Sequence, residues 1–233
     1  MLGVDGGGEE TVTLTRADFL RVYQCGINRW RAGRDNDGGY VLFEVGTPDI
    51  FLSGGICDDN SFERAVLDFY PTIECDAYDP ISDGGAVKHP RLRFHQENVP
   101  LPGEIAAGKN MLVKLDIEGD EWPWLWSLAF PDAIAQLVVE LHSPHLERWN
   151  WDVLRDLTKT HALVHFHANN WDGIVDIDGV RVPGTMETTW VRRDLAGNLE
   201  PNREPIPGFL DMPNDKSKPD HVIDWAPFFG WTP

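Results

Sequence analysis

Acidic and imidazole side chains follow apolar runs at three places in the second half of the chain. Asp116 and Glu118 come directly after the run 111–115, and His142 and His167 each end a later run. The carboxyl ends of parallel strands meet along one edge of a sheet, so these groups can share a pocket. Carboxylates and imidazoles can take a proton from a bound hydroxyl. We therefore expect these four residues to be catalytic, with His142 or Asp116 as the general base and Glu118 and His167 orienting the substrate. His165 is expected to face the other side of the sheet.

The same region contains residue types that bind divalent metals. Asp116, Glu140 and His142 offer carboxylate and imidazole ligands that suit Mg²⁺, Mn²⁺ or Zn²⁺. The chain has no compact H-x-x-x-H or C-x-x-C signature. A divalent metal, Mg²⁺ or Mn²⁺, is therefore kept as an alternative, and no residue is assigned as its ligand.

An earlier apolar run leads into a glycine pair and an acidic loop. Gly54 and Gly55 let a ligand approach the backbone closely, and a helix is predicted to begin near Ser61. Asp58 and Asp59 argue against a phosphate at this loop, since a phosphate site needs bare amides and a lysine. The loop therefore favours a positively charged ligand.

Two further polar positions extend this ligand site. Asp79 closes the next predicted strand, where an acidic residue usually contacts ribose hydroxyls. Glu97 or Asn98, after the third strand, is placed to meet an adenine edge. The Walker and G-x-G-x-x-G patterns are both absent. The order of these features predicts a nucleoside-type ligand, and S-adenosylmethionine, with its sulfonium and ammonium, fits an acidic loop.

The elements that must position these residues alternate between strands and helices, which predicts an α/β domain with a mostly parallel sheet. The predicted core strands cover 49–53, 72–78, 92–95, 111–115, 136–141, 162–167 and 186–191, after a short strand at 41–44. Helices are predicted at 15–30, from Ser61 onward and at 146–159, with a hairpin at 178–179. We expect one domain over 1–233, with 1–14 as a loose tail and 198–233 as a Pro- and aromatic-rich segment that packs back on it.

Several of these stretches resemble the FkbM-type methyltransferase-like family. The resemblance is carried by 33–41, 54–63, 114–122, 138–142, 167–170 and 187–192, and Lys114-Leu115-Asp116-Ile117-Glu118-Gly119-Asp120-Glu121-Trp122 is its most specific piece. It implies a Rossmann-like class I methyltransferase fold, with seven strands, the last antiparallel, and helices on both faces. It also implies S-adenosylmethionine as methyl donor and a sugar or other small hydroxyl acceptor. The chain departs from the family at Ser53-Gly54-Gly55, where an acidic residue followed by G-x-G is usual.

The composition of the chain limits the classes of partner that it is expected to bind. With 20 Lys and Arg against 38 Asp and Glu, the formal net charge is -18, and such a surface repels nucleic acids and anionic membranes. Three cysteines and no signal peptide are typical of a cytoplasmic protein. The partner expected is a small-molecule or glycan acceptor.

Two other functions remain open. One is a metal-dependent hydrolase that uses Asp116, Glu140 and His142. The other is a non-catalytic carbohydrate-binding module with a tryptophan-lined cleft, since aromatic faces stack on sugar rings.

Overall fold

The computed structural model describes residues 17–82, 89–105, 110–128, 131–145, 147, 149–177 and 179–231. Its helices, three of them 3-10 (η), are η1 (Asp18–Leu20), α1 (Ser61–Phe69), η2 (Pro102–Glu104), α2 (Glu121–Trp126), η3 (Pro131–Ala133) and α3 (Trp149–Leu157). Its strands are β1 (Tyr23–Cys25), β2 (Arg29–Ala32), β3 (Tyr40–Phe43), β4 (Ile50–Gly54), β5 (Cys75–Tyr78), β6 (Leu92–His95), β7 (Met111–Leu115), β8 (Ile134–His142), β9 (His161–Ala168), β10 (Ile174–Ile177), β11 (Val180–Pro183), β12 (Thr185–Arg192) and β13 (Leu199–Pro201).

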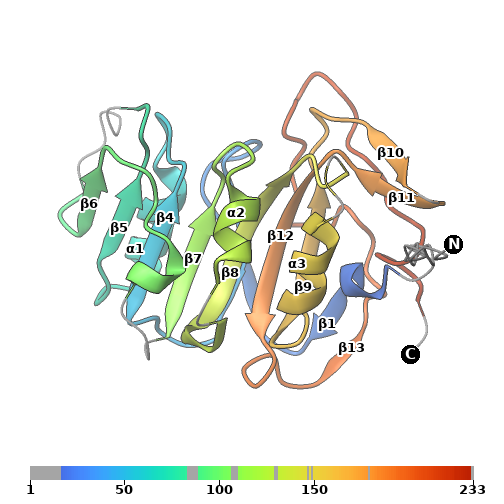
Figure 1. The fold of residues 1–233 in the computed structure, drawn as a ribbon, viewed down its shortest axis with the longest axis horizontal. Coiled ribbons are helices and arrows are strands. Elements are labelled where there is room, and N and C mark those ends of the chain that lie inside the picture. The colour runs from blue at the N-terminus through green and yellow to red at the C-terminus, as the bar shows by residue number, and fades with distance from the viewer. Residues whose placement is uncertain are drawn as a thin grey trace, which may run out of the picture.

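A seven-stranded sheet forms the centre of the molecule, in the order β6-β5-β4-β7-β8-β12-β9 (Figure 1). The pairs β5–β6, β4–β5, β4–β7 and β7–β8 are parallel, whereas β12 runs antiparallel to both β8 and β9. This confirms the predicted Rossmann-like fold with an antiparallel last strand. All seven predicted core strands are present, with ends that differ by up to three residues.

The order of the strands reverses between β4 and β7. From β4 the chain builds outward through β5 to β6, then returns to add β7 on the other side of β4 and continues to β8. In open sheets of this kind, ligands bind beyond the carboxyl ends of the strands at such a reversal. The edge formed by the ends of β4, β7 and β8 is therefore where a site is expected.

Helices cover both faces of this sheet, as predicted. On one face, Phe62 and Val66 of α1 pack on Phe51, whereas on the other face α2 and α3 pack on a cluster that contains Leu52. Neighbouring residues of β4 thus serve opposite faces, which is the period-two pattern of a strand buried on both sides. Phe69 at the end of α1 is 44% exposed, and its ring stacks on that of Trp30.

The predicted helix at 15–30 is wrong. Within the described part of this range, residues 17–30, only Asp18–Leu20 forms a helical turn, and two strands, β1 and β2, follow it. Gly26 interrupts the stretch between the two strands, and β2 pairs with β3 to form a hairpin. The hairpin lies over the same face as α1, because residues of both its strands join the apolar cluster of that helix.

The C-terminal part of the chain lies against several of these elements. Strand β13 pairs with β1, and Ile223 and Phe228 are buried in the cluster that contains α2 and α3. The indole Nε1 of Trp231 donates to the carbonyl of Val22 at 3.0 Å. The expected loose tail 1–14 lies outside the described residues, as does Asp178 of the predicted hairpin, which forms as β10 and β11.

One part of the sheet is left open. A groove of about 670 Å³ crosses the face of β4, β5 and β6 on which Leu52 and Tyr78 lie, next to the segment 100–105. Among the described residues, none of the helices has the length and apolar character needed to span a bilayer.

Candidate functional site

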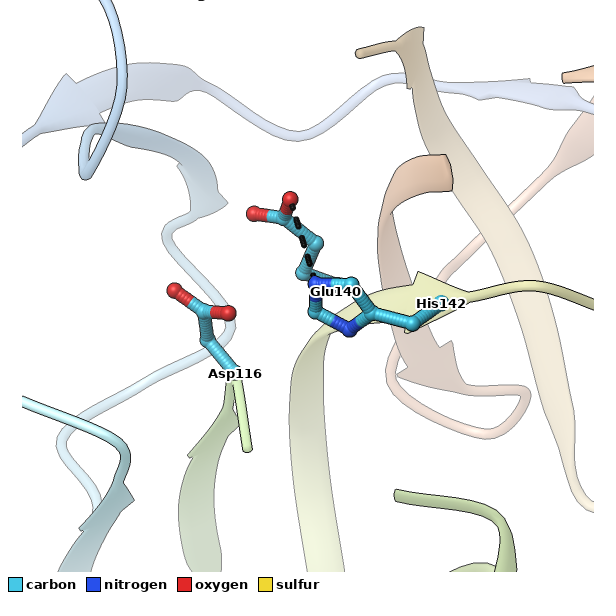
Figure 2. A group of neighbouring side chains, drawn as sticks. All are labelled: Asp116, Glu140 and His142. Atoms are coloured by element: carbon cyan, nitrogen blue, oxygen red, sulfur yellow. Dashed lines mark ion pairs between the residues drawn. The ribbon is translucent and has the colours of Figure 1, made fainter. Parts of the chain in front are cut away.

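Three side chains from β8 and from the end of β7 converge at the carboxyl edge of the sheet. Asp116 follows β7, Glu140 lies within β8 and His142 ends it, and one potential ligand atom of each lies within 4.8 Å of the others (Figure 2). Glu140 is buried, while the side chains of Asp116 and His142 keep 24% and 20% of their surface exposed. A small molecule approaching this edge can therefore reach Asp116 and His142.

Tyr40, on strand β3 of the β2–β3 hairpin, contacts two of these three side chains with its hydroxyl. Its hydroxyl lies 2.8 Å from Oδ2 of Asp116 and 3.0 Å from Oε2 of Glu140. A phenol carries one proton and can donate it to only one of these oxygens at a time. Burial, with the negative charges of Asp116 and Glu140, raises the pKa of Tyr40 well above its usual value, so the hydroxyl stays protonated.

The hairpin is held in this position by side chains of the sheet. The amide of Gln136 pairs with the backbone of Phe43, accepting from its N–H at 2.8 Å and donating to its carbonyl at 3.2 Å. Thr189 donates its hydroxyl to the carbonyl of Val41 at 2.6 Å. These bonds fix β3, and with it the direction in which Tyr40 points.

His142 is oriented by a buried acid. Its Nδ1 lies 3.0 Å from Oε1 of Glu121, and this carboxylate also accepts from the backbone N–H of Ile117 at Oε1 and from that of Gly119 at Oε2. Its Nε2 faces Oε1 of Glu140 at 3.8 Å (Figure 2). Burial alone would lower the pKa of His142, but the hydrogen bond and charge of Glu121, with the charges of the other nearby acids, raise it to about 9.

The loop after β7 is linked to the loop after β4. Lys114 donates its Nζ to the carbonyls of Gly55 and Gly54 at 2.7 and 3.3 Å, and the same atom lies 3.6 Å from Oδ2 of Asp116. Glu118 takes a positive φ of 56° and projects its largely exposed carboxylate to 3.6 Å from Nε2 of His142. Of the expected catalytic residues, Asp116, Glu118 and His142 are therefore neighbours.

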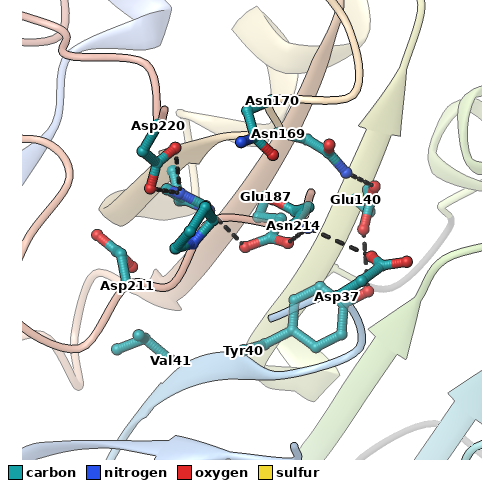
Figure 3. Close-up of polar contacts among 12 residues, drawn as sticks. Asp37, Tyr40, Val41, Glu140, Asn169, Asn170, Glu187, Asp211, Asn214 and Asp220 are labelled. Carbon is teal, nitrogen blue, oxygen red and sulfur yellow. Dashed lines mark hydrogen bonds and ion pairs between the residues drawn. The ribbon is translucent and has the colours of Figure 1, made fainter. Parts of the chain in front are cut away.

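A second group of acids shares Glu140. Oxygens of Asp37, Glu140 and Glu187 lie within 4.8 Å of one another. Asn169 donates to Oε1 of Glu140 at 2.7 Å, and Asn214 donates to Glu187 at 2.5 Å and to Asp37 at 3.3 Å (Figure 3). Burial, with the charges of Asp116 and Glu187, raises the pKa of Glu140 well above its usual value.

His167, the fourth expected catalytic residue, lies behind this second group. Its side chain is buried, with Nδ1 2.9 Å from Glu187 and Nε2 3.0 Å from Asp220 of the C-terminal segment. Burial would lower the pKa of His167, but the charge of Glu187 and its hydrogen bonds with both acids raise it well above the usual value. The imidazole thus contacts the site through Glu187.

The expectation that His165 faces the other side of the sheet is wrong. Its Nε2 lies 2.9 Å from Asp211 of the same C-terminal segment that contacts His167. Residues two apart on a strand point to the same face, so His165 and His167 share one.

The glycine loop after β4 is shaped by the protein itself. Gly55 has a φ of +76°, and a Cβ there would lie 1.6 Å from the carbonyl oxygen of Asp116. Asp58 is exposed, whereas Asp59 accepts from the N–H and hydroxyl of Ser61 at the start of α1 and pairs with Arg34 at 3.1 Å. Of the two acids expected to face the cofactor, Asp59 is therefore held by Ser61 and Arg34, whereas Asp58 is exposed to solvent.

Asp79 organises the neighbouring loops. Its Oδ1 accepts from the N–H groups of Ile81 and Ser82, and its Oδ2 accepts from Cys57 at 2.9 Å. Burial would raise its pKa, but these backbone hydrogen bonds lower it, so Asp79 is ionised at neutral pH. Glu97 and Asn98 are exposed after β6, near the Tyr78–His95 ring stack.

The site residues predicted from the sequence do not include Tyr40, Asp37, Glu187 or the C-terminal Asn214 and Asp220. Glu187 could have been noticed, because it is a charged residue inside a run predicted to be a buried strand. The others come from a turn, a hairpin and an irregular segment, where no strand end indicates that they reach the site.

Comparisons with known proteins give distant similarities to solved structures. A candidate hemolysin from Streptococcus thermophilus is 13% identical, with a TM-score of 0.39 over 66% of this chain and 62% of its own, so the chain spans less than two thirds of its length. A candidate methyltransferase from Thermoplasma acidophilum is 9% identical, with a TM-score of 0.37 over 63% and 69% of the two chains. The antibiotic-resistance methyltransferase Kmr is 14% identical, with a TM-score of 0.35 over 69% and 99%. No family model and no curated protein matches the chain.

Proposed function

We propose that this protein is an S-adenosylmethionine-dependent methyltransferase of the FkbM type that acts on a hydroxyl group of a sugar or another small acceptor. The observation that carries the proposal is the topology of the sheet. Its order reverses between β4 and β7, and its antiparallel β12 is inserted between β8 and β9, as the resemblance to class I methyltransferases implies. The candidate side chains gather beside that reversal, which is where such sheets bind ligands.

The residues at the ends of β4 and β5 suit the cofactor. Oδ2 of Asp79 accepts one backbone N–H, which leaves this ionised oxygen able to accept from a ribose hydroxyl. Asp58 supplies an exposed negative charge for the ammonium group, next to the glycine loop that follows β4. Glu97 or Asn98 would meet the adenine. S-adenosylmethionine supplies a methyl group on a sulfonium, which leaves as a neutral thioether once the methyl is transferred.

The acceptor side lies at the ends of β7 and β8. Asp116 and His142 are both partly exposed there, and we propose that one of them takes the proton of the acceptor hydroxyl: Asp116 at neutral pH, or His142 where the pH exceeds its raised pKa of about 9 and the ring is neutral. The exposed Glu118 orients the acceptor from the loop, and His167 contributes by holding Glu187. The net charge of -18 supports a small or glycan acceptor over a nucleic acid.

Calorimetry of the full chain with S-adenosylmethionine tests the proposal, with NAD as the control ligand. We expect micromolar binding of S-adenosylmethionine, no heat with NAD, and about tenfold weaker cofactor binding in Asp79→Asn. Asp49→Asn is the matched control, because Asp49 also accepts a backbone N–H but lies before β4, at the opposite edge. A protein that is folded by circular dichroism and binds no S-adenosylmethionine is not a methyltransferase.

A metal-dependent hydrolase is the second candidate, favoured by the convergence of Asp116, Glu140 and His142. A hydrolase of this kind should bind a metal tightly and should not bind a nucleoside. The same calorimetry therefore distinguishes it from a methyltransferase. The carbohydrate-binding module is less supported, because Trp122, Trp124 and Trp151 are packed in the core.

A further inference from the structure

We propose that Asp116, Glu140 and His142 bind one divalent cation of the Mn²⁺ type at the carboxyl edge of the sheet. Two carboxylates and one imidazole are ligands that Mn²⁺ accepts, and the imidazole makes Mg²⁺ the poorer fit. Three protein ligands leave positions for water or a substrate oxygen, which is the pattern of a catalytic metal site. The binding site itself does not depend on the proposed methyl transfer.

The distances between the donor atoms suit such an ion. A cation with ligands at about 2.1 Å separates neighbouring donors by about 3 Å and opposite donors by about 4.2 Å. The three side chains offer one atom each within 4.8 Å of the others, and Nε2 of His142 is 3.8 Å from Oε1 of Glu140. Small changes of side-chain torsion are enough to close this set around an ion.

The histidine is prepared as a ligand. A metal-binding histidine almost always donates its second ring N–H to a carboxylate or carbonyl, which fixes the tautomer. Nδ1 of His142 has this partner in the fully buried Glu121 at 3.0 Å. Its Nε2 faces Glu140 and Glu118 at 3.8 and 3.6 Å, both longer than a hydrogen bond.

The surroundings contain more acceptors than donors. Tyr40 offers one proton to Asp116 and Glu140 together, and its position leaves one of these contacts without a hydrogen. Asn214 is 4% exposed, its amide nitrogen lies against Asp37 and Glu187, and its Oδ1 has no partner among the described residues (Figure 3). The ammonium of Lys114, 3.6 Å from Asp116, balances one carboxylate of this region, and the remaining acids can accommodate a further positive charge.

The ion belongs with His142 and not with the second acidic group. The second group offers carboxylates only, because the nearby His167 has both ring nitrogens against Glu187 and Asp220. The exposed surface of Asp116 and His142 also gives an ion a path from solvent. Where the proposed function holds, an acceptor hydroxyl bound to this ion would lose its proton to solvent more readily, and with the ion bound Asp116 and His142 serve as its ligands in place of a free general base.

Electron paramagnetic resonance of Mn²⁺ added to the metal-stripped full chain tests this site. We expect about one bound ion per chain, a dissociation constant in the micromolar range, and electron spin echo modulation from one directly bound imidazole nitrogen. His142→Gln should remove the nitrogen modulation and weaken binding at least tenfold, and Asp116→Asn should also weaken binding at least tenfold. Asp37→Asn changes a carboxylate of the second group and should alter the affinity less than threefold.

Three results overturn the inference. The first is that the wild type shows no saturable Mn²⁺ binding below millimolar concentration. The second is that Mn²⁺ binds but its spectrum shows no nitrogen modulation. The third is that Asp37→Asn loses as much Mn²⁺ affinity as His142→Gln. If a variant of one of the proposed metal ligands does not fold, the Mn²⁺ spectrum of the wild-type protein still tests the site. Binding of S-adenosylmethionine to the metal-stripped chain is scored separately, so failure of the metal site and failure of the proposed function are distinguishable.

Discussion

Gly55 shows how one residue connects the two halves of the candidate site. Its backbone has a φ of +76°, and a Cβ at this position would meet the carbonyl oxygen of Asp116. Gly55→Ala should therefore lower the free energy of unfolding by roughly 3 kcal/mol or more. The added Cβ and the backbone oxygen of Asp116 are both held by the main chain, so neither can rotate away to relieve the clash. Urea denaturation measures this loss. Gly26→Ala is the matched control, because nothing lies within 4 Å of its Cβ, and an equal loss there would refute the explanation.

His161 makes a pH-dependent contribution to stability. Its side chain is buried and Nε2 lies 2.9 Å from the carbonyl of Ile134, and burial lowers its pKa from 6.5 to about 4. Because the unfolded chain takes up the proton first, stability falls as the pH drops from about 6.5 toward 4. From pH 7 to pH 5 this group should cost about 2 kcal/mol of unfolding free energy.

Urea denaturation at both pH values measures the contribution of His161. His161→Gln should remove it, so the difference between variant and wild type changes with pH. His221→Gln changes a histidine whose contact lies at the surface and should keep the wild-type profile. If both variants keep that profile, His161 does not titrate as described.

At the scale of single residues, sequence reasoning found the part of the site that belongs to strand ends. Asp116, Glu118 and His142 were expected together because parallel strands end at one edge, and the structure brings them together. Tyr40 and Asp37 were not assigned, since their approach depends on how the β2–β3 hairpin packs on the sheet. That packing is set by contacts between residues about 90 to 150 positions apart, such as Gln136 with Phe43.

At the scale of elements, the strands of the central sheet were predictable and the N-terminal segment was not. Strands β4, β7 and β8 are buried along nearly their whole length and read as mostly apolar runs, which is the strongest strand signal. The segment 15–30 mixes apolar and polar residues in a way that fits a helix face, yet β1 and β2 depend on partners that lie far along the chain or across a turn. Tertiary pairing therefore decides its structure.

The C-terminal segment should contribute to stability through a few buried aromatic side chains. Phe228 is fully buried, with its ring centroid 4.3 Å from that of Phe166, so Phe228→Ala should cost about 3–5 kcal/mol. Phe209 lies in the same segment but is 77% exposed, and Phe209→Ala should cost less than about 1 kcal/mol. Equal effects of the two substitutions in thermal unfolding would show that the segment is not anchored through Phe228.

At the scale of the whole molecule, the excess of negative charge should make stability depend on salt. A net charge of -18 repels itself in the compact state, and the screening length falls from about 30 Å at 0.01 M salt to about 8 Å at 0.15 M. With a chelator present, that increase in NaCl should stabilise the fold by about 1 kcal/mol, or roughly 2–4 °C in Tm. A Tm that is constant or falls would mean that the local ion pairs outweigh the general repulsion.

Screening and site binding can be separated in the same thermal measurement. At 0.15 M NaCl the general repulsion is already screened. Micromolar Mn²⁺ adds almost nothing to this ionic strength, so it cannot stabilise the fold by further screening. An ion bound only by the folded state still stabilises it by mass action, by about 2.7 kcal/mol at a hundred times the dissociation constant. We therefore expect Mn²⁺ to raise the Tm of the wild type at constant salt and to leave His142→Gln nearly unchanged, while NaCl should shift both proteins equally. A Mn²⁺ shift of the same size in both proteins would instead trace the stabilisation to acids elsewhere on the surface.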